Sequence, residues 1–259
     1  MNRLITGIGL AVVGAYLIGW APELVFLAAA LLMSVLCYRE YSGIVAAHAI
    51  PQPGIFGVLA GIVILFWPAQ TLIGVSLLAV CAFVAAFRHD DLRGVLPQIA
   101  ATFFGAFYTF APWRFSIDLR QISHHLLLFA LAINWAGDTA AYYAGRRFGK
   151  HKLAPIVSPG KSWEGAAASV AGSVLFGVVY LEYFFKGLSW WQIVILAVAG
   201  NIAGQFGDLA ESAIKRGAGL KDSGSLLPGH GGMLDRVDSS LFTLPIVYAL
   251  YLLVTVTEK

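Results

Sequence analysis

Long apolar runs separated by short polar segments dominate this chain. A membrane-spanning helix needs about 20 mainly apolar residues. The candidate spans lie near Leu4–Trp20, Pro22–Cys37, Ile55–Trp67, Gln70–Phe87, Val95–Trp113, His125–Gly145, Trp163–Phe185, Trp190–Leu209 and Val237–Val256. Only Pro68 and Ala69 separate the third span from the fourth, so their boundary is the least well defined. The pattern predicts an all-α, polytopic integral membrane protein with about nine transmembrane helices.

We expect these helices to form one integrated membrane domain. Residues 1–120 would supply about five N-terminal helices, and residues 121–259 would form a catalytic region with charged loops at 146–162 and 215–236. The composition agrees, because 59% of the residues are hydrophobic and 12% are charged, whereas soluble domains carry roughly 25% charged residues. The composition therefore excludes a large soluble domain, and the absence of a basic recognition module argues against nucleic-acid binding.

The positions of lysine and arginine predict the orientation in the membrane. If the N-terminus lies in the cytoplasm, thirteen of the seventeen basic residues fall on the cytoplasmic side and four on the opposite side. Such an excess is typical of cytoplasmic loops. We therefore expect the loops 146–162 and 215–236 to face the cytoplasm.

The densest charge lies between the last two apolar runs. The segment Ser212–Asp238 reads SAIKRGAGLKDSGSLLPGHGGMLDRVD and combines lysines, arginines and aspartates with six glycines. Carboxylates suit Mg²⁺, whereas Lys and Arg suit phosphate, and glycines allow the backbone to approach a ligand closely. The mixture predicts a site for a metal and a polyphosphate.

Helical spacing places further polar residues on common faces. One face of the eighth candidate helix carries Asn201, Gln205, Asp208, Ser212 and Lys215; the sixth carries Asn134, Asp138, Tyr142 and Arg146; the ninth begins with Asp235, Asp238 and Ser239. Charges inside a membrane are costly, so such residues default to functional hypotheses. We expect the active site on the cytoplasmic half of these later helices. The alternative is a set of buried ion pairs, for example Asp138 with Arg146 or Asp208 with Lys215.

A second cluster, Ser158–Gly165, reads SPGKSWEG and comes just before the seventh candidate helix. Backbone N–H groups at a helix start favour anions, and Lys161 adds a positive charge. Ser162 can instead serve as the N-cap, with Glu164 favoured by the helix dipole. Both interpretations stay open from the sequence.

The charged segment resembles the signature of the phosphatidate cytidylyltransferase family. The matching positions are Ser212, Lys215–Arg216, Lys221–Asp222, Gly224, Leu227–Pro228, His230–Gly231–Gly232 and Asp235–Arg236–Val237–Asp238. The likeness extends to Gly207–Asp208–Leu209, to Ser158–Gly165 and to the opening Arg3–Leu4–Ile5–Thr6. The resemblance therefore spans most of the chain.

The resemblance implies a membrane enzyme that converts CTP and phosphatidic acid to CDP-diacylglycerol and pyrophosphate. It implies Mg²⁺, with a second cation such as K⁺ or Mg²⁺, and a homodimer in the bilayer of the bacterial cytoplasmic (inner) membrane. Together with the helical spacing, it assigns Asp208 and Asp235 as metal ligands. Asp222, Asp238 and Lys221 complete the implied catalytic set, and the implied phosphate contacts are Ser158, Lys161, Ser162, Ser212, Lys215, Arg216, Lys221, His230 and Arg236.

Two other functions are compatible with a polar site in a membrane. One is a related nucleotidyltransferase or phosphotransferase that acts on another lipid phosphate. The other is an ion or solute transporter, for which repeat-like interrupted helices in two halves are expected. The polar residues here are concentrated in the later helices, which favours the enzyme.

Overall fold

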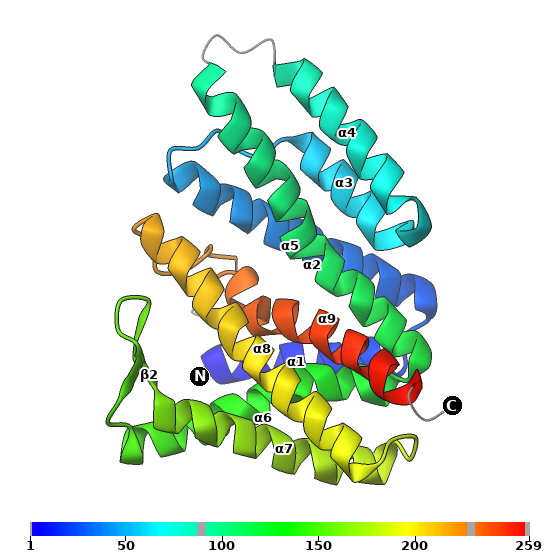
Figure 1. Ribbon diagram of the computed structural model, residues 1–259, viewed down its shortest axis with the longest axis vertical. Coiled ribbons are helices and arrows are strands. Elements are labelled where there is room, and N and C mark those ends of the chain that lie inside the picture. Colours follow the sequence, from blue (N-terminus) through cyan, green and yellow to red (C-terminus); the bar gives the residue numbers. More distant parts are fainter. Residues whose placement is uncertain (1, 87–91, 227–230, 257–259) are drawn as a thin grey trace. The chain divides into compact units, whose positions relative to one another are not determined.

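The chain is almost entirely helical in the computed structural model, which describes residues 2–86, 92–226 and 231–256 (Figure 1). The described helices are α1 (Asn2–Gly19), α2 (Glu23–Ala47), α3 (Ile55–Phe66), α4 (Thr71–Ala86), α5 (Val95–Ile122), α6 (His124–Phe148), α7 (Trp163–Phe184), α8 (Trp190–Gly217) and α9 (Leu234–Val256). Short 3₁₀ turns at Pro68–Gln70 and Leu92–Gly94 precede α4 and α5. The predicted all-α class is confirmed.

Each candidate span corresponds to one helix, but several helices extend beyond their apolar run. α2 continues past Cys37 to Ala47, α5 past Trp113 to Ile122, and α8 past Leu209 to Gly217. Charged residues end an apolar run without ending a helix, because the backbone hydrogen bonds do not depend on hydropathy. The predicted loop 215–236 accordingly begins after Gly217 and ends before Leu234.

The helices have the length and surface of an integral membrane protein. Among the described residues, six segments are long and apolar enough to cross a membrane: Glu23–Ala47, Pro68–Ala86, Leu92–Ile122, Trp163–Phe184, Trp190–Gly217 and Leu234–Thr255. α4 exposes large apolar side chains such as Leu72, which is 81% exposed, and Leu77. Exposed apolar surface of this extent fits lipid as the solvent. That all nine helices cross the bilayer stays a prediction.

The chain forms two compact units whose segments alternate along the sequence. The first unit comprises Met1–Ala11, Pro22–Arg114 and Ile214–Arg236; the second comprises Val12–Ala21, Phe115–Ala213 and Val237–Lys259. α1, α5, α8 and α9 contribute to both units. The predicted organisation into residues 1–120 and 121–259 stays a prediction.

In the first unit, aromatic side chains of α2 and α5 pack against glycines of α3. The Tyr38 hydroxyl donates to the carbonyl of Gly54 (3.3 Å). A methyl group at Gly57 would overlap the Tyr38 ring, and one at Gly61 would overlap Phe110. The glycine pair therefore allows close helix packing within the chain, as small residues do in membranes.

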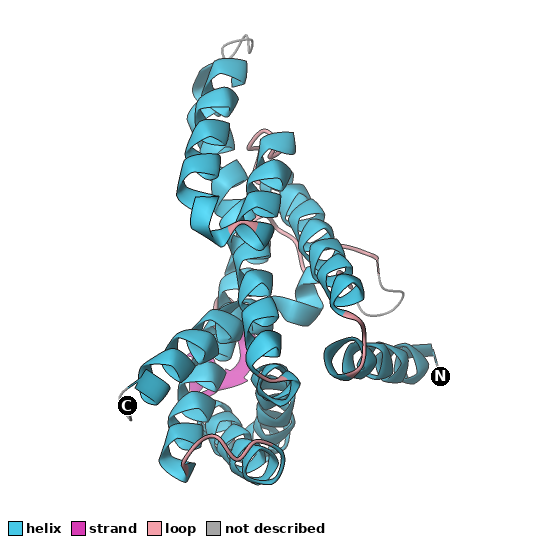
Figure 2. Ribbon diagram, turned by 90° about the vertical axis from the view of Figure 1, so that its right-hand side faces the viewer, coloured by secondary structure: helices cyan, strands magenta, loops and turns pink. Residues whose placement is uncertain are grey.

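In the second unit, α6 and α7 lie side by side over most of their lengths (Figures 1 and 2). A methyl group at Gly165 of α7 would lie 3.3 Å from the carbonyl oxygen of Ala141 and 3.5 Å from the Cα of Gly145, both on α6. The two backbones therefore approach closely where α6 ends and α7 begins. This contact positions the polar residues of α6 and α7 that line the cavity described below.

A β-hairpin joins α6 to α7, where the sequence predicted only a charged loop. β1 (Lys152–Ala154) pairs antiparallel with β2 (Ser158–Ser162), with Lys152 opposite Ser162 and Ala154 opposite Ser158. Figure 2 shows this hairpin as the two strands of an otherwise helical chain, within the part that the structure describes. The hairpin delivers Lys161 to the first turn of α7.

Candidate functional site

A cavity of about 180 Å³ opens in the second unit between α6, the hairpin, α7 and α8. Its polar lining consists of Asp138, Tyr142, Lys161, Ser162, Ser169 and Gln205. Ligand pockets usually measure about 300–1,000 Å³. A cavity of this size suits a phosphate group better than a complete nucleotide.

The inner end of the cavity is held by hydrogen bonds between buried polar side chains. The Asn201 amide donates to the Ser169 hydroxyl (3.1 Å), and the Gln205 amide donates to the Asn201 side-chain oxygen (2.8 Å) and to the carbonyl of Ala166 (3.2 Å). Asn201 is 1% exposed. The predicted polar face of α8 thus binds α7, and its inner part is structural.

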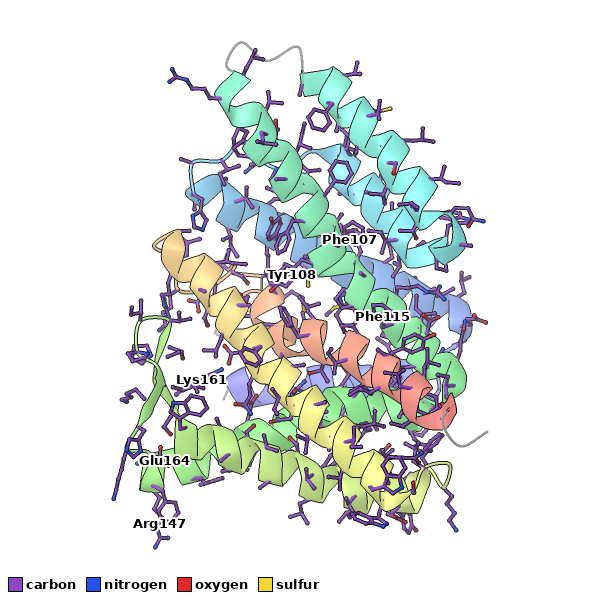
Figure 3. All side chains as sticks on the ribbon, viewed as in Figure 1. Phe107, Tyr108, Phe115, Arg147, Lys161 and Glu164 are labelled. Atoms are coloured by element: carbon purple, nitrogen blue, oxygen red, sulfur yellow. The ribbon has the colours of Figure 1, made fainter. Side chains whose placement is uncertain are left out.

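At the outer end, the predicted site residues Lys161 and Asp208 form an ion pair. The Lys161 ammonium lies 2.6 Å from the Asp208 carboxylate, with side chains 28% and 32% exposed. Ser212 donates to the other carboxylate oxygen of Asp208 (3.3 Å). Figure 3 shows Lys161 on the hairpin strand. Lys161 and Asp208 are about fifty residues apart in the sequence, and the ion pair brings their segments together. It places a cation and a carboxylate side by side at an accessible position.

The first turn of α7 confirms one of the two interpretations of Ser162. Ser162 is the N-cap, and its side chain accepts from the backbone N–H of Gly165 (3.2 Å). Glu164, labelled in Figure 3, accepts from the backbone N–H of Lys150 (3.2 Å) and lies 2.6 Å from Nδ1 of His151. Ser162 therefore caps the helix and also lines the cavity, and its contact with phosphate stays a prediction.

This capping role makes a prediction for stability. Replacing Ser162 with Ala should destabilise the protein by about 1 kcal/mol, because an N–H of α7 loses its partner. The melting temperature in detergent should fall by roughly 2–4 °C. Ser158→Ala, in the same hairpin, is the matched control and should leave the melting temperature unchanged. Equal losses for the two variants would contradict the cap as the source of the effect.

In the first unit, Lys215 and Asp235 form a second, more buried ion pair. Lys215 Nζ contacts Asp235 Oδ1, and the side chains are 8% and 7% exposed. Asp235 Oδ2 accepts from the backbone N–H groups of Ser223 (2.9 Å) and Gly232 (2.8 Å). Asp208 thus pairs with Lys161, and Lys215 pairs with Asp235.

The remaining predicted residues differ in their surroundings. Lys221, Asp222, Arg216 and Arg236 are exposed on or beside the loop after α8, and Arg216 donates to the carbonyl of Leu220 (3.0 Å). Asp238 is partly buried in the first turns of α9 and accepts from the backbone N–H of Ser239 (2.7 Å). His230 lies outside the described residues. The exposed cations are accessible to an anionic ligand.

Comparison with known proteins decides the family. The sequence matches the cytidylyltransferase family over residues 1–254. The chain belongs to this family. It is 35% identical to the phosphatidate cytidylyltransferase of Staphylococcus haemolyticus, with 84% of this chain and 86% of that protein covered. It is 36% identical to phosphatidate cytidylyltransferase 5, chloroplastic, of Arabidopsis thaliana, with 94% and 69% covered. The predicted family resemblance is confirmed, and this cytidylyltransferase is an enzyme.

One residue in contact with the signature of this cytidylyltransferase was missed. Glu40 of α2 accepts hydrogen bonds from Ser223, Met233 and Leu234, all in or next to the loop between α8 and α9. The only signal in the sequence was a carboxylate shortly after the end of an apolar run. Nothing in that pattern connects it with residues almost two hundred positions later.

The residues present fit the Mg²⁺ that the family implies. Mg²⁺ usually uses one or two carboxylates together with substrate phosphates and water. Asp138 and Asp208 are close enough for their charges to interact, with Lys161 beside them. Within residues 2–86, 92–226 and 231–256, no group of three or more His, Cys, Asp or Glu side chains is arranged to hold a metal alone. The arrangement therefore fits a metal that arrives with phosphate ligands.

Proposed function

We propose that this cytidylyltransferase converts CTP and phosphatidic acid to CDP-diacylglycerol and pyrophosphate. The observation that carries the proposal is the Lys161–Asp208 pair at the mouth of a phosphate-sized cavity, in a chain of the cytidylyltransferase family. Relatives that the chain matches over most of its length carry the name phosphatidate cytidylyltransferase.

The reaction requires charge neutralisation more than covalent chemistry. A phosphate oxygen of phosphatidic acid attacks the α-phosphorus of CTP, a new P–O–P bridge forms, and the bond to the β-phosphate breaks to release pyrophosphate. Both reactants are anionic, so positioning and electrostatic stabilisation dominate the barrier. The lipid phosphate is itself the nucleophile, and no protein nucleophile is needed.

The side chains divide this task between carboxylates and cations. We propose Asp208 and Asp235 as the metal ligands; Asp138 lines the cavity, and its charge interacts with that of Asp208. Mg²⁺, when bound, would neutralise phosphate oxygens and align the leaving group. Lys161 is held at Asp208 and is positioned to turn from the carboxylate to a phosphate oxygen. Further proposed phosphate contacts are Ser158, Ser162, Ser212, Lys215, Arg216, Lys221, His230 and Arg236, with Asp222 and Asp238 as additional carboxylates.

The cellular setting follows from the charge distribution. We propose that the protein lies in the bacterial cytoplasmic membrane with its N-terminus and charged loops in the cytoplasm, where CTP is available. The excess of lysine and arginine on that side supports this orientation. A homodimer in the bilayer and a second cation remain part of the same proposal, on the strength of the family resemblance.

A turnover assay on the purified protein in detergent tests the function. The protein is given phosphatidic acid and labelled CTP, with Mg²⁺ or with EDTA. We expect CDP-diacylglycerol and pyrophosphate in equal amounts with Mg²⁺, and no product with EDTA. Product from another lipid phosphate alone would replace phosphatidic acid as the substrate. Folded protein that turns over none of the lipid phosphates would contradict the proposal.

A further inference from the structure

Glu40 of α2 contacts the signature loop from a distant part of the sequence. Its Oε1 accepts from the backbone N–H of Met233 (2.9 Å), and its Oε2 accepts from the backbone N–H of Leu234 (2.8 Å) and the hydroxyl of Ser223 (2.8 Å). All these residues lie in the first unit. One carboxylate therefore contacts both described parts of the loop, residues 218–226 and 231–233, and the start of α9.

The contacts make Glu40 a cap for α9 supplied by another helix. Leu234 is the first residue of α9, and the first N–H groups of a helix have no partner within it. A negative charge at this end is also favoured by the helix dipole. Glu40 thus determines where α9 begins, one residue before Asp235.

Ser223 carries the effect of Glu40 to Asp235. While its hydroxyl donates to Glu40, the same oxygen accepts from the backbone N–H of Asp235 (3.3 Å). The backbone N–H of Ser223 donates to Asp235 Oδ2 (2.9 Å). Ser223 therefore holds both the backbone and the carboxylate of Asp235, and Glu40 holds Ser223.

Two glycines of the signature are explained by the same carboxylate. A methyl group at Gly224 would lie 2.8 Å from Glu40 Oε1, and one at Gly232 would overlap both Glu40 and Ser223. The loop needs glycine at these two positions because Glu40 occupies the space that a side chain would take. Nε2 of His48, the C-cap of α2, lies 2.9 Å from the carbonyl oxygen of Ile214, so the end of α2 also contacts the last turns of α8.

We propose that Glu40 is a positioning residue of the reaction, which fixes the orientation of Asp235 through Ser223 and the start of α9. The inference rests on the proposed function for its kinetic consequence. Glu40 contacts no reacting atom; it acts by limiting the positions that the Asp235 carboxylate and its partner Lys215 can adopt. Loss of such outer hydrogen-bond partners typically costs about 10–100-fold in activity.

Glu40→Gln is the variant that tests this role. Gln has nearly the same shape but only one acceptor oxygen, so its NH₂ group must face an N–H or O–H donor. We expect kcat to fall about 10–100-fold, with a change in KM for CTP below about threefold. Glu23→Gln, which removes an exposed charge from the same helix, is the matched control and should retain wild-type kcat.

A double-mutant cycle with Ser223→Ala separates positioning from general destabilisation. If Glu40 acts through Ser223, the two substitutions together should reduce kcat by little more than Glu40→Gln alone, since coupled residues are not additive. Multiplicative losses in the double variant, or a kcat for Glu40→Gln within about twofold of wild type, would overturn the inference. A kcat loss that only tracks the loss of folded protein would overturn it as well.

Hydrogen exchange keeps this test independent of the proposed function. Amides of residues 231–236 should exchange faster in Glu40→Gln than in wild type, whereas amides of α6 and α7 should not change. If wild type shows no turnover with any lipid phosphate but this local change is present, the proposed function fails and the positioning of the loop by Glu40 stands. Unchanged exchange at residues 231–236 would overturn the inference.

Discussion

Asp208→Asn should lower kcat by about 10²–10³-fold, because it removes the carboxylate charge from the point where metal and phosphates are proposed to meet. Its effect on folding should be small. The Lys161–Asp208 pair is about one-third exposed, and exposed ion pairs contribute about 0–1 kcal/mol. The expected result is therefore an inactive protein with a nearly unchanged melting temperature. Turnover under saturating CTP and phosphatidic acid, together with thermal melting in detergent, measures both quantities.

Metal binding can be followed without turnover. Mn²⁺ is the probe, and its binding in the presence of CTP is monitored by electron paramagnetic resonance. We expect Mn²⁺ to bind the wild-type protein and to bind Asp208→Asn more weakly. Glu182→Gln, an exposed substitution on α7, is the control and should bind Mn²⁺ as wild type does. Near-normal turnover in Asp208→Asn would refute the assignment of Asp208 as a ligand. Normal Mn²⁺ binding with lost turnover would assign Asp208 to substrate alignment instead.

The helices could be predicted from the sequence because apolar runs in lipid admit few structures. A buried backbone in the bilayer must satisfy its hydrogen bonds within the segment, so an apolar run of sufficient length becomes a helix. The ends were less predictable: α2 passes through Arg39 and Glu40 to Ala47, although these charges end its apolar run. The strands Lys152–Ala154 and Ser158–Ser162 contain no β-branched residue and no apolar alternation, so the hairpin could not be predicted from the sequence pattern.

Which residue types form the site could be predicted, but most of their partners could not. Regular spacing correctly placed Asn201 and Gln205 as neighbours on α8, because helical geometry fixes such pairs locally. The pairing of Lys161 with Asp208 depends on how the hairpin folds against α8, and no local rule encodes it. Glu40 was missed for the same reason: its contacts with Ser223 and Leu234 are tertiary.

Lys215→Met should destabilise the protein strongly, in contrast to the same change at Lys161. Removing one partner of a buried ion pair costs about 3–5 kcal/mol, and we expect the lower value because Ser223 and Gly232 still donate to Asp235. A loss of about 3 kcal/mol corresponds to a fall of roughly 6–12 °C in melting temperature. Turnover should also fall, because Asp235 loses the cation that orients it.

Lys161→Met provides the matched comparison, since it removes the same charge from the other Lys–Asp pair. The Lys215–Asp235 side chains are 8% and 7% exposed, against 28% and 32% for Lys161–Asp208. Because water screens the exposed pair, Lys161→Met should cost at most about 1 kcal/mol while still weakening phosphate binding. Lys186→Met, at an exposed position between α7 and α8, should change neither property. Equal falls in melting temperature for Lys161→Met and Lys215→Met would show that burial does not determine how much each ion pair contributes to stability. A large shift confined to Lys215→Met would show that the Lys215–Asp235 pair contributes to folding stability, whereas the Lys161–Asp208 pair contributes little to it.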